Sequence, residues 1–365
     1  MLNTSFLRLR AALGAAWIFL NMAVLNLYQL WIMAFKPFGR RYARQLMGTL
    51  CFQDWIDFTA FYSPSATMVV TGDAMPKDTS VPVIFIANHQ VDADWWYILQ
   101  LIQAHGGTPN VKIAMKDSLA KVPVFGWGMY MFETLFLRRD LAHDKPHVQQ
   151  YMESFVEDAF PVWLMLFPEG TTIHTEYVTK SQNFATAQGR PTLERVLLPR
   201  AAGLQLLLDA YANTDVKPEI YDITIGYPSY SGEVPTYEMG YSRHIDVGVP
   251  SMQHVLARTH PEHVHLHITK HAFEDANTNV ESFLDKQWLK KEALLNEFIA
   301  HQEFASASAS RRCVTPETNI WGTLRLWAGA AISLVLLPVA LPCLLLCSTV
   351  AHVRNKTHTK STKSA

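Results

Sequence analysis

The chain has 365 residues, of which 49% are apolar and 17% are charged, and its formal net charge is −1. This length allows a full catalytic core, and a net charge near zero excludes a whole-molecule field that would attract nucleic acid. The four cysteines, Cys51, Cys313, Cys343 and Cys347, show neither a disulfide framework nor the spacing of a zinc site.

Two apolar segments, residues 11–35 and 327–351, are each long enough to cross about 30 Å of hydrocarbon as a helix. The first is too long for the apolar region of a signal peptide and ends in bulky side chains, so we expect a retained membrane anchor. Basic residues from Lys36 to Arg44 follow it and favour a cytoplasmic position for that end. Basic residues also follow the second segment. If both segments span the membrane, the two basic stretches lie on opposite sides, and the positive-inside rule cannot be satisfied for both. The topology is therefore not decided by sequence.

Between the two apolar segments, short β-branched runs alternate with helical patterns. This alternation predicts an α/β fold with a mostly parallel or mixed sheet flanked by helices. We expect the catalytic domain at residues 62–305, a linker at 306–326 and a basic disordered tail at 352–365. Residues 36–61 could form a membrane-lying amphipathic helix or a helix packed on the sheet. Strands are expected at residues 68–71, 81–87, 111–115, 134–137, 162–167, 195–198, 221–225 and 263–269.

A histidine and an aspartate lie where the second expected strand opens into a helix. Residues 88–94 read Asn-His-Gln-Val-Asp-Ala-Asp, and of the fifteen histidines only His89 has an acid five positions later. A carboxylate on one imidazole nitrogen fixes the tautomer, so that the other nitrogen can take a proton from a hydroxyl. Ligands of α/β sheets bind at the carboxyl ends of strands. We therefore expect His89 to be a general base that Asp94 orients.

Three further blocks end expected strands with residues suited to binding an anion. Arg139 and Arg200 offer a planar fork for phosphate oxygens, and Gly170 lets backbone amides approach an anion closely. Hydroxyls at Thr171 and Thr172 can add donors. Parallel strands would bring these blocks to the same rim as His89.

A histidine-rich segment, residues 260–267, could bind a metal through alternate side chains on one strand face. No carboxylate or thiolate is spaced to complete the ligand set. We therefore expect a strand with a polar face and no metal site.

The four blocks, in this order, resemble the glycerolipid acyltransferase family that includes the lysophosphatidic acid acyltransferases (1-acylglycerol-3-phosphate O-acyltransferases). The resemblance covers roughly residues 60–300, and its eukaryotic branch shares the Leu-x-Pro-Arg form of the last block. The matching residues are Asn88, His89 and Asp94, then Phe136 and Arg139, then Pro168, Glu169, Gly170 and Thr171, and finally Pro199 with Arg200.

The resemblance implies transfer of a fatty acyl group from acyl-CoA, as co-substrate and without a further cofactor, to a lysophospholipid hydroxyl in a membrane. His89 and Asp94 would be catalytic. The head-group phosphate would be bound by Phe136, Arg139, Glu169, Gly170, Thr171 and Arg200.

The identity of the acceptor is the least determined part of this interpretation. Many family members have arginine after Glu-Gly-Thr, where this chain has Thr172. We expect lysophosphatidic acid, with lysocardiolipin and lysophosphatidylinositol as alternatives. We expect the endoplasmic reticulum membrane, with a mitochondrial membrane as the alternative, because residues 1–35 lack transit-peptide character. The competing functions are a lipid-binding scaffold and a lipid hydrolase. The chain lacks the Gly-x-Ser-x-Gly elbow that is typical of a lipid hydrolase.

Overall fold

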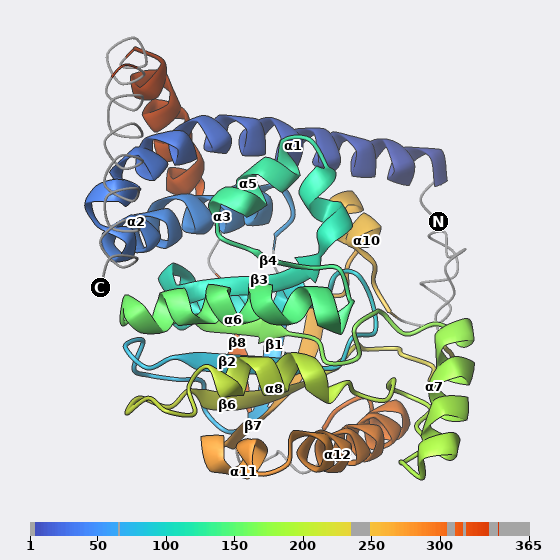
Figure 1. Ribbon diagram of the computed structural model, residues 1–365. Helices are drawn as coiled ribbons and strands as arrows, with labels where there is room; N and C mark the ends of the chain where they lie inside the picture. Colours follow the sequence, from blue (N-terminus) through green and yellow to red (C-terminus); the bar gives the residue numbers. More distant parts are fainter. Residues whose placement is uncertain are drawn as a thin grey trace, which may run out of the picture.

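The computed structural model describes residues 4–64, 66–234, 249–304, 311–316, 319–335 and 342. A single eight-stranded sheet crosses the molecule in the order β4-β3-β5-β2-β6-β7-β1-β8 (Figure 1). All pairs from β4 to β6 are parallel, as is β1 with β7, whereas β6 with β7 and β1 with β8 are antiparallel. The predicted α/β class with a mostly parallel sheet is therefore confirmed. The strands are β1 Thr67–Gly72, β2 Val83–Ala87, β3 Val111–Lys116, β4 Leu135–Leu137, β5 Trp163–Leu166, β6 Glu219–Gly226, β7 His263–His271 and β8 Arg312–Val314.

Helices cover both faces of the sheet and form two apolar cores. On β2, Phe85 packs into the core that α3 and α4 complete, and its neighbour Ile84 packs into the core of α6, α8 and α12. A strand buried on both faces explains why β2 reads as a continuous apolar run. The helices are α1 Thr4–Phe35, α2 Arg40–Leu46, α3 Gln53–Tyr62, α4 Asp94–Ala104, α5 Phe125–Met131, α6 Leu141–Glu157, α7 Thr175–Gln188, α8 Ala201–Asp209, α10 Met252–Ala257, α11 Phe273–Asn277 and α12 Val280–His301.

The strand expected at residues 195–198 is absent, and this prediction was wrong. Side-chain carboxylates and a hydroxyl take the place of a strand partner for this segment. Arg195 N donates to Glu292, Leu197 N donates to Glu169 Oε2, and Leu198 N donates to Ser181 Oγ. The backbone donors are thus satisfied without a ladder, and the apolar run reflects burial rather than sheet pairing.

The sheet also extends into the predicted linker, because β8 pairs with β1. Residues 36–61 pack on the domain. They form α2, a π-helix at Met47–Phe52, and α3, in which Trp55 and Phe58 are buried. Most of the predicted segment 327–351 lies outside the described residues, and its described part belongs to a shorter apolar helix, Ile320–Val335.

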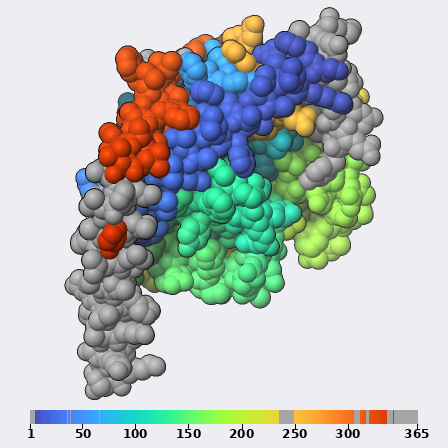
Figure 2. Space-filling model, turned by 90° about the horizontal axis from the view of Figure 1, so that it is seen from above, coloured from blue at the N-terminus to red at the C-terminus, as the bar shows by residue number. Residues whose placement is uncertain are grey.

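Helix α1 runs across one side of the molecule, over α3, α5 and α10 (Figure 1). Residues 5–34 are long and apolar enough to cross a membrane. The helix nevertheless packs on the domain through polar side chains. Asn26 donates to the Val124 carbonyl at 2.8 Å, and Gln29 donates to the Gly128 carbonyl at 3.2 Å. Figure 2 shows α1 in blue along the surface, where Leu9, Leu13, Phe19, Leu20 and Leu30 are exposed.

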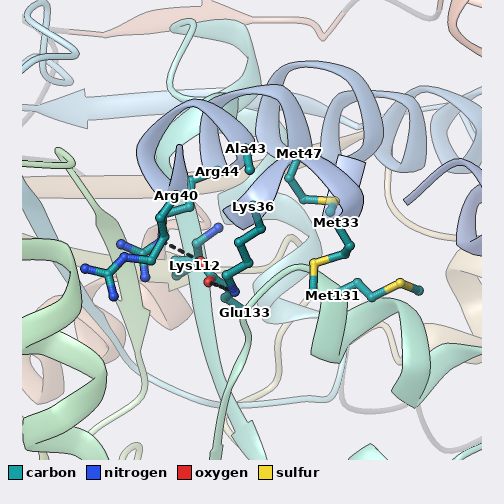
Figure 3. A pocket seen from close by; sticks show the side chains of 9 residues that line it. All are labelled: Met33, Lys36, Arg40, Ala43, Arg44, Met47, Lys112, Met131 and Glu133. Atoms are coloured by element: carbon teal, nitrogen blue, oxygen red, sulfur yellow. Dashed lines mark hydrogen bonds and ion pairs between the residues drawn. The ribbon is translucent and has the colours of Figure 1, made fainter. Parts of the chain in front are cut away.

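Basic residues that follow α1 form ion pairs with the domain. Lys36 Nζ lies 2.6 Å from Glu133 Oε1, and Arg44 Nε lies 2.7 Å from Glu133 Oε2 (Figure 3). Arg40 pairs with Asp158 at 2.6 Å. The neighbouring cations hold the pKa of Glu133 down to about 2 against the opposing effect of burial. These ion pairs connect the end of α1 to the domain. The cavity beside the cluster has a volume of only about 10 Å³ and leaves no room for a substrate.

Candidate active site

The predicted base and its carboxylate meet at the end of β2. Asn88 fixes the turn by a pair of hydrogen bonds with the Ile225 backbone on β6. His89 Nδ1 lies 2.9 Å from Asp94 Oδ2, which also accepts the Val91 amide at 2.9 Å. Because an ionised carboxylate only accepts, His89 donates from Nδ1, and Nε2 remains as the basic nitrogen. The structure thus brings the pair together in the geometry that a general base requires.

A third side chain, Tyr227, contacts this pair and was missed by the sequence analysis. It follows β6, and its hydroxyl donates to Asp94 Oδ1. Burial, with the nearby charge of Asp94, raises the pKa of the Tyr227 phenol, so the hydroxyl keeps its proton. The sequence held no signal for this contact, because only the pairing of β6 with β2 brings Tyr227 near Asp94.

Glu169 lies behind the site and braces it. Its carboxylate is buried and accepts three donors: His89 N at 3.1 Å, Trp288 Nε1 at 3.2 Å and Leu197 N at 3.0 Å. Burial raises the pKa of Glu169 to about 7, although these donors and the nearby His89 oppose the shift. Glu169 is not part of the cavity wall. Glu169 therefore holds the His89 backbone amide, and its predicted contact with a head group stays a prediction.

A cavity of about 420 Å³ opens beside His89. Arg139, Gly170 and Arg200 line it as predicted, and Thr172 lines it too, whereas Phe136 and Thr171 are not part of its wall. Most of the rest of the wall is apolar and comes chiefly from β3, β4, β5, α6 and α8, and the wall also includes the charged residues Asp92, Lys116 and Asp144. Its aliphatic side chains include Ile113, Leu135, Leu137, Val148, Leu166, Leu206 and Leu207.

Backbone hydrogen bonds hold both arginines at the cavity, and Arg139 also has a left-handed backbone. Arg139 has a φ of +66°, and the Asp144 carboxylate holds its loop by accepting the Arg138, Arg139 and Asp140 amides at 3.0, 2.8 and 3.2 Å. Arg200 precedes α8, and its amide donates to the Pro168 carbonyl at 2.9 Å.

A left-handed glycine brings the third block beside Arg200. Gly170 has a φ of +74°, and a Cβ at this position would lie 3.7 Å from Arg200 Cδ. This conformation explains why the block needs glycine at residue 170.

The histidines of β7 make other contacts. His267 Nδ1 lies 3.0 Å from Thr71 Oγ1, and His265 packs edge-on against Phe298. Across the part of the chain that the structure describes, no group of three or more histidine, cysteine or acidic side chains could hold a metal.

Part of the chain is similar to known acyltransferases. Residues 68–208 match the family model described as Acyltransferase. The chain is 28% identical over 302 residues to a probable 1-acyl-sn-glycerol-3-phosphate acyltransferase 5 of Arabidopsis thaliana. The matched region covers 81% of this chain and 72% of the plant protein. It is 29% identical over 237 residues to lysocardiolipin acyltransferase 1 of Gallus gallus, covering 64% and 57% of the two chains.

A relative with a third acceptor in its name also matches. The chain is 31% identical over 240 residues to lysophosphatidylinositol acyltransferase 10 of Caenorhabditis elegans, covering 64% and 56% of the two chains. The matched part thus spans little more than half of the chicken and nematode proteins. The family match over residues 68–208 includes the His89 site, and the named relatives are similar to the chain over 237 to 302 residues.

Proposed function

We propose that this protein transfers a fatty acyl group from acyl-CoA to a lysophospholipid hydroxyl. The observation that carries the proposal is the His89–Asp94 pair opening on a cavity that combines aliphatic walls with Arg139 and Arg200. Aliphatic walls suit an acyl chain, and guanidinium groups suit a phosphate. One cavity therefore offers all the chemistry that the two substrates need.

The proposed reaction is a direct transfer. His89 Nε2 takes the proton of the acceptor hydroxyl while its oxygen attacks the thioester carbonyl. The carbon–sulfur bond then breaks, CoA leaves as its thiolate, and the proton on His89 is available to it. Asp94 stabilises the imidazolium in the meantime. This step forms one ester from one thioester and needs no acyl-enzyme.

The acceptor that we propose is lysophosphatidic acid, with Arg139 and Arg200 on its phosphate. Thr172 contributes a hydroxyl to the cavity wall where other family members carry a cation. A monoester phosphate carries more charge than the diester phosphates of lysocardiolipin and lysophosphatidylinositol, so the cations of the wall, Arg139, Arg200 and Lys116, favour it. The lack of a further cation at residue 172 makes this preference smaller. The names of the relatives keep both diester acceptors as alternatives.

We further propose that α1 carries the protein into the surface of a membrane. From Leu9 to Leu30 its exposed side chains are apolar, while its Asn26 and Gln29 face the domain. Such a helix can lie within the interface with its apolar side among the acyl chains. Trp127 and Tyr130 on α5, exposed beside α1, are residue types that favour this depth. The endoplasmic reticulum is the proposed membrane, and a mitochondrial membrane is the alternative.

The test of the proposed function uses the full chain in phospholipid vesicles with radiolabelled acyl-CoA and three acceptors: lysophosphatidic acid, lysophosphatidylinositol and monolysocardiolipin. We expect label in the diacyl product, with the highest kcat/KM for lysophosphatidic acid. Release of free fatty acid without an acceptor would support a hydrolase instead. No turnover with any acceptor would leave the scaffold as the better description.

The arginines give a sharper prediction about the acceptor. Arg200→Ala and Arg139→Ala should each lower kcat/KM for lysophosphatidic acid by about tenfold to hundredfold, because each removes a charge-assisted hydrogen bond. The effect should appear in the KM of the acceptor. Arg138→Ala is the matched control, because Arg138 is the adjacent exposed arginine and is not part of the cavity wall. A raised KM for acyl-CoA with an unchanged KM for the acceptor would contradict this assignment.

A further inference from the structure

Asp94 accepts hydrogen bonds from residues other than His89, and one of these donors is a buried tyrosine hydroxyl. The carboxylate is fully buried, so every one of its hydrogen bonds must come from the protein. Oδ2 accepts His89 Nδ1 and the Val91 amide, and Oδ1 accepts the hydroxyl of Tyr227. Among the described residues, Tyr227 is therefore the partner that fixes the oxygen facing away from His89.

This contact restrains the rotation of the carboxylate. A carboxylate with donors on only one oxygen can turn about its χ2 bond, whereas donors on both oxygens set its plane. Tyr227 is itself immobilised, because its side chain is fully buried and its ring packs edge-on against Tyr97 with centroids 5.8 Å apart. Tyr227, which directly follows β6, thus sets the plane of the Asp94 carboxylate that contacts His89. None of the four sequence blocks lies on β6.

We propose that Tyr227 is a positioning residue that acts through Asp94 to hold His89 in the orientation needed for proton transfer. This inference rests on the proposed function. Without the hydroxyl, Oδ1 is buried with no donor, so the carboxylate turns away or takes up a proton. Either change weakens its bond to His89 and lowers the rate of the chemical step, while the substrates bind as before.

Tyr227→Phe removes the hydroxyl alone, and Tyr97→Phe is its matched control. Both tyrosines are buried and belong to the same aromatic pair, but the described residues give the Tyr97 hydroxyl no hydrogen-bond partner. In vesicles, Tyr227→Phe should lower kcat by about tenfold to hundredfold, with unchanged KM for both substrates. Tyr97→Phe should keep the parental kcat. Equal kcat values in parent and Tyr227→Phe protein would overturn the proposal, as would a loss of the same size in Tyr97→Phe.

A double variant tests whether the effect passes through Asp94. In an Asp94→Asn background the carboxylate partner of His89 is already gone, so adding Tyr227→Phe should change kcat by no more than about twofold. Independent, multiplying losses would show that Tyr227 acts elsewhere and would reject a positioning role through Asp94. Thermal melting of all four proteins identifies any variant that fails to fold.

A measurement without substrate separates this inference from the proposed function. Diethyl pyrocarbonate modifies neutral imidazole, and peptide mass spectrometry follows the modification of His89 alone. We expect the rate of His89 modification in Tyr227→Phe to differ from that in parent and Tyr97→Phe protein, because the Asp94 contact at Nδ1 sets the reactivity of Nε2. If the parent transfers no acyl group to any lysophospholipid, the proposed function fails and this rate still tests Tyr227. If the three rates are equal, the role of Tyr227 fails whatever the reaction is.

Discussion

Replacement of His89 with glutamine should abolish most acyl transfer, with a loss in kcat of about 10²–10⁴, the range that a general base supplies. Glutamine keeps an amide donor near Asp94, so the buried carboxylate need not lose its partner, and the fold should survive. The KM values for acyl-CoA and acceptor should change little. Initial rates with labelled acyl-CoA in vesicles, at matched protein amounts, measure the effect.

His147→Gln is the control for this substitution, because His147 is an exposed histidine on α6 outside the cavity wall. It should retain the parental rate. Asp94→Asn should fall with His89→Gln, since the imidazolium then loses its counter-charge. Parental turnover in the His89→Gln protein would rule out His89 as the base, and the cavity would need another proton acceptor.

Glu169→Gln should destabilise the fold and also remove part of its pH dependence. Glutamine cannot accept at both ends, so one of the donors from His89, Trp288 or Leu197 meets an amide hydrogen. Leaving such a buried donor unpaired costs about 1–3 kcal/mol. The His89 backbone would also shift, so activity should fall as well.

The pH dependence follows from the buried carboxyl. Its pKa is about 7 in the folded protein, against 4.5 for an ordinary glutamate. Between these values the folded state binds a proton that the unfolded state does not, so stability falls as the pH rises from about 4.5 to 7. The full difference corresponds to about 3 kcal/mol. The hydrogen bonds that Glu169 accepts, and the nearby His89, oppose the rise of this pKa.

Thermal melting between pH 4.5 and 7.5 measures this effect as the difference between the parent and Glu169→Gln proteins. Asp54, whose pKa burial raises to about 6, contributes the same trend to both proteins and cancels. The parent should lose more stability than the variant over this range. Parallel curves would contradict a raised pKa at Glu169.

The sequence predicted the fold where one residue pattern had one structural solution. The apolar run before His89 became β2, because a strand buried on both faces needs apolar side chains throughout. The same reasoning failed at residues 195–198, which end in the apolar run Val196, Leu197 and Leu198 but lie between α7 and α8. Their amides find the carboxylates of Glu169 and Glu292, and periodicity contains no information about such distant acceptors.

The candidate site was predictable to the extent that its contacts are local. His89 and Asp94 are five residues apart, and one turn at the end of β2 brings them together. Tyr227 is 133 residues from Asp94 and reaches it only because β6 pairs with β2. Glu169 occupied the expected block, but its burial behind the cavity wall depends on Trp288 from α12. Local spacing therefore predicted the contact between His89 and Asp94. The contacts that hold this pair depend on the strand order and could not be predicted.

The Asp144 carboxylate holds the Arg139 loop entirely through main-chain amides. No side chain at residues 138–140 takes part in these three bonds, so the bonds themselves do not depend on which side chain residue 139 displays, provided that it tolerates the left-handed backbone there. The position beside the cavity can thus exchange one residue for another without rebuilding its support. The residues that recognise a ligand and the bonds that hold the loop are therefore separate. Single substitutions at the cavity could then change the acceptor while the loop keeps its fold.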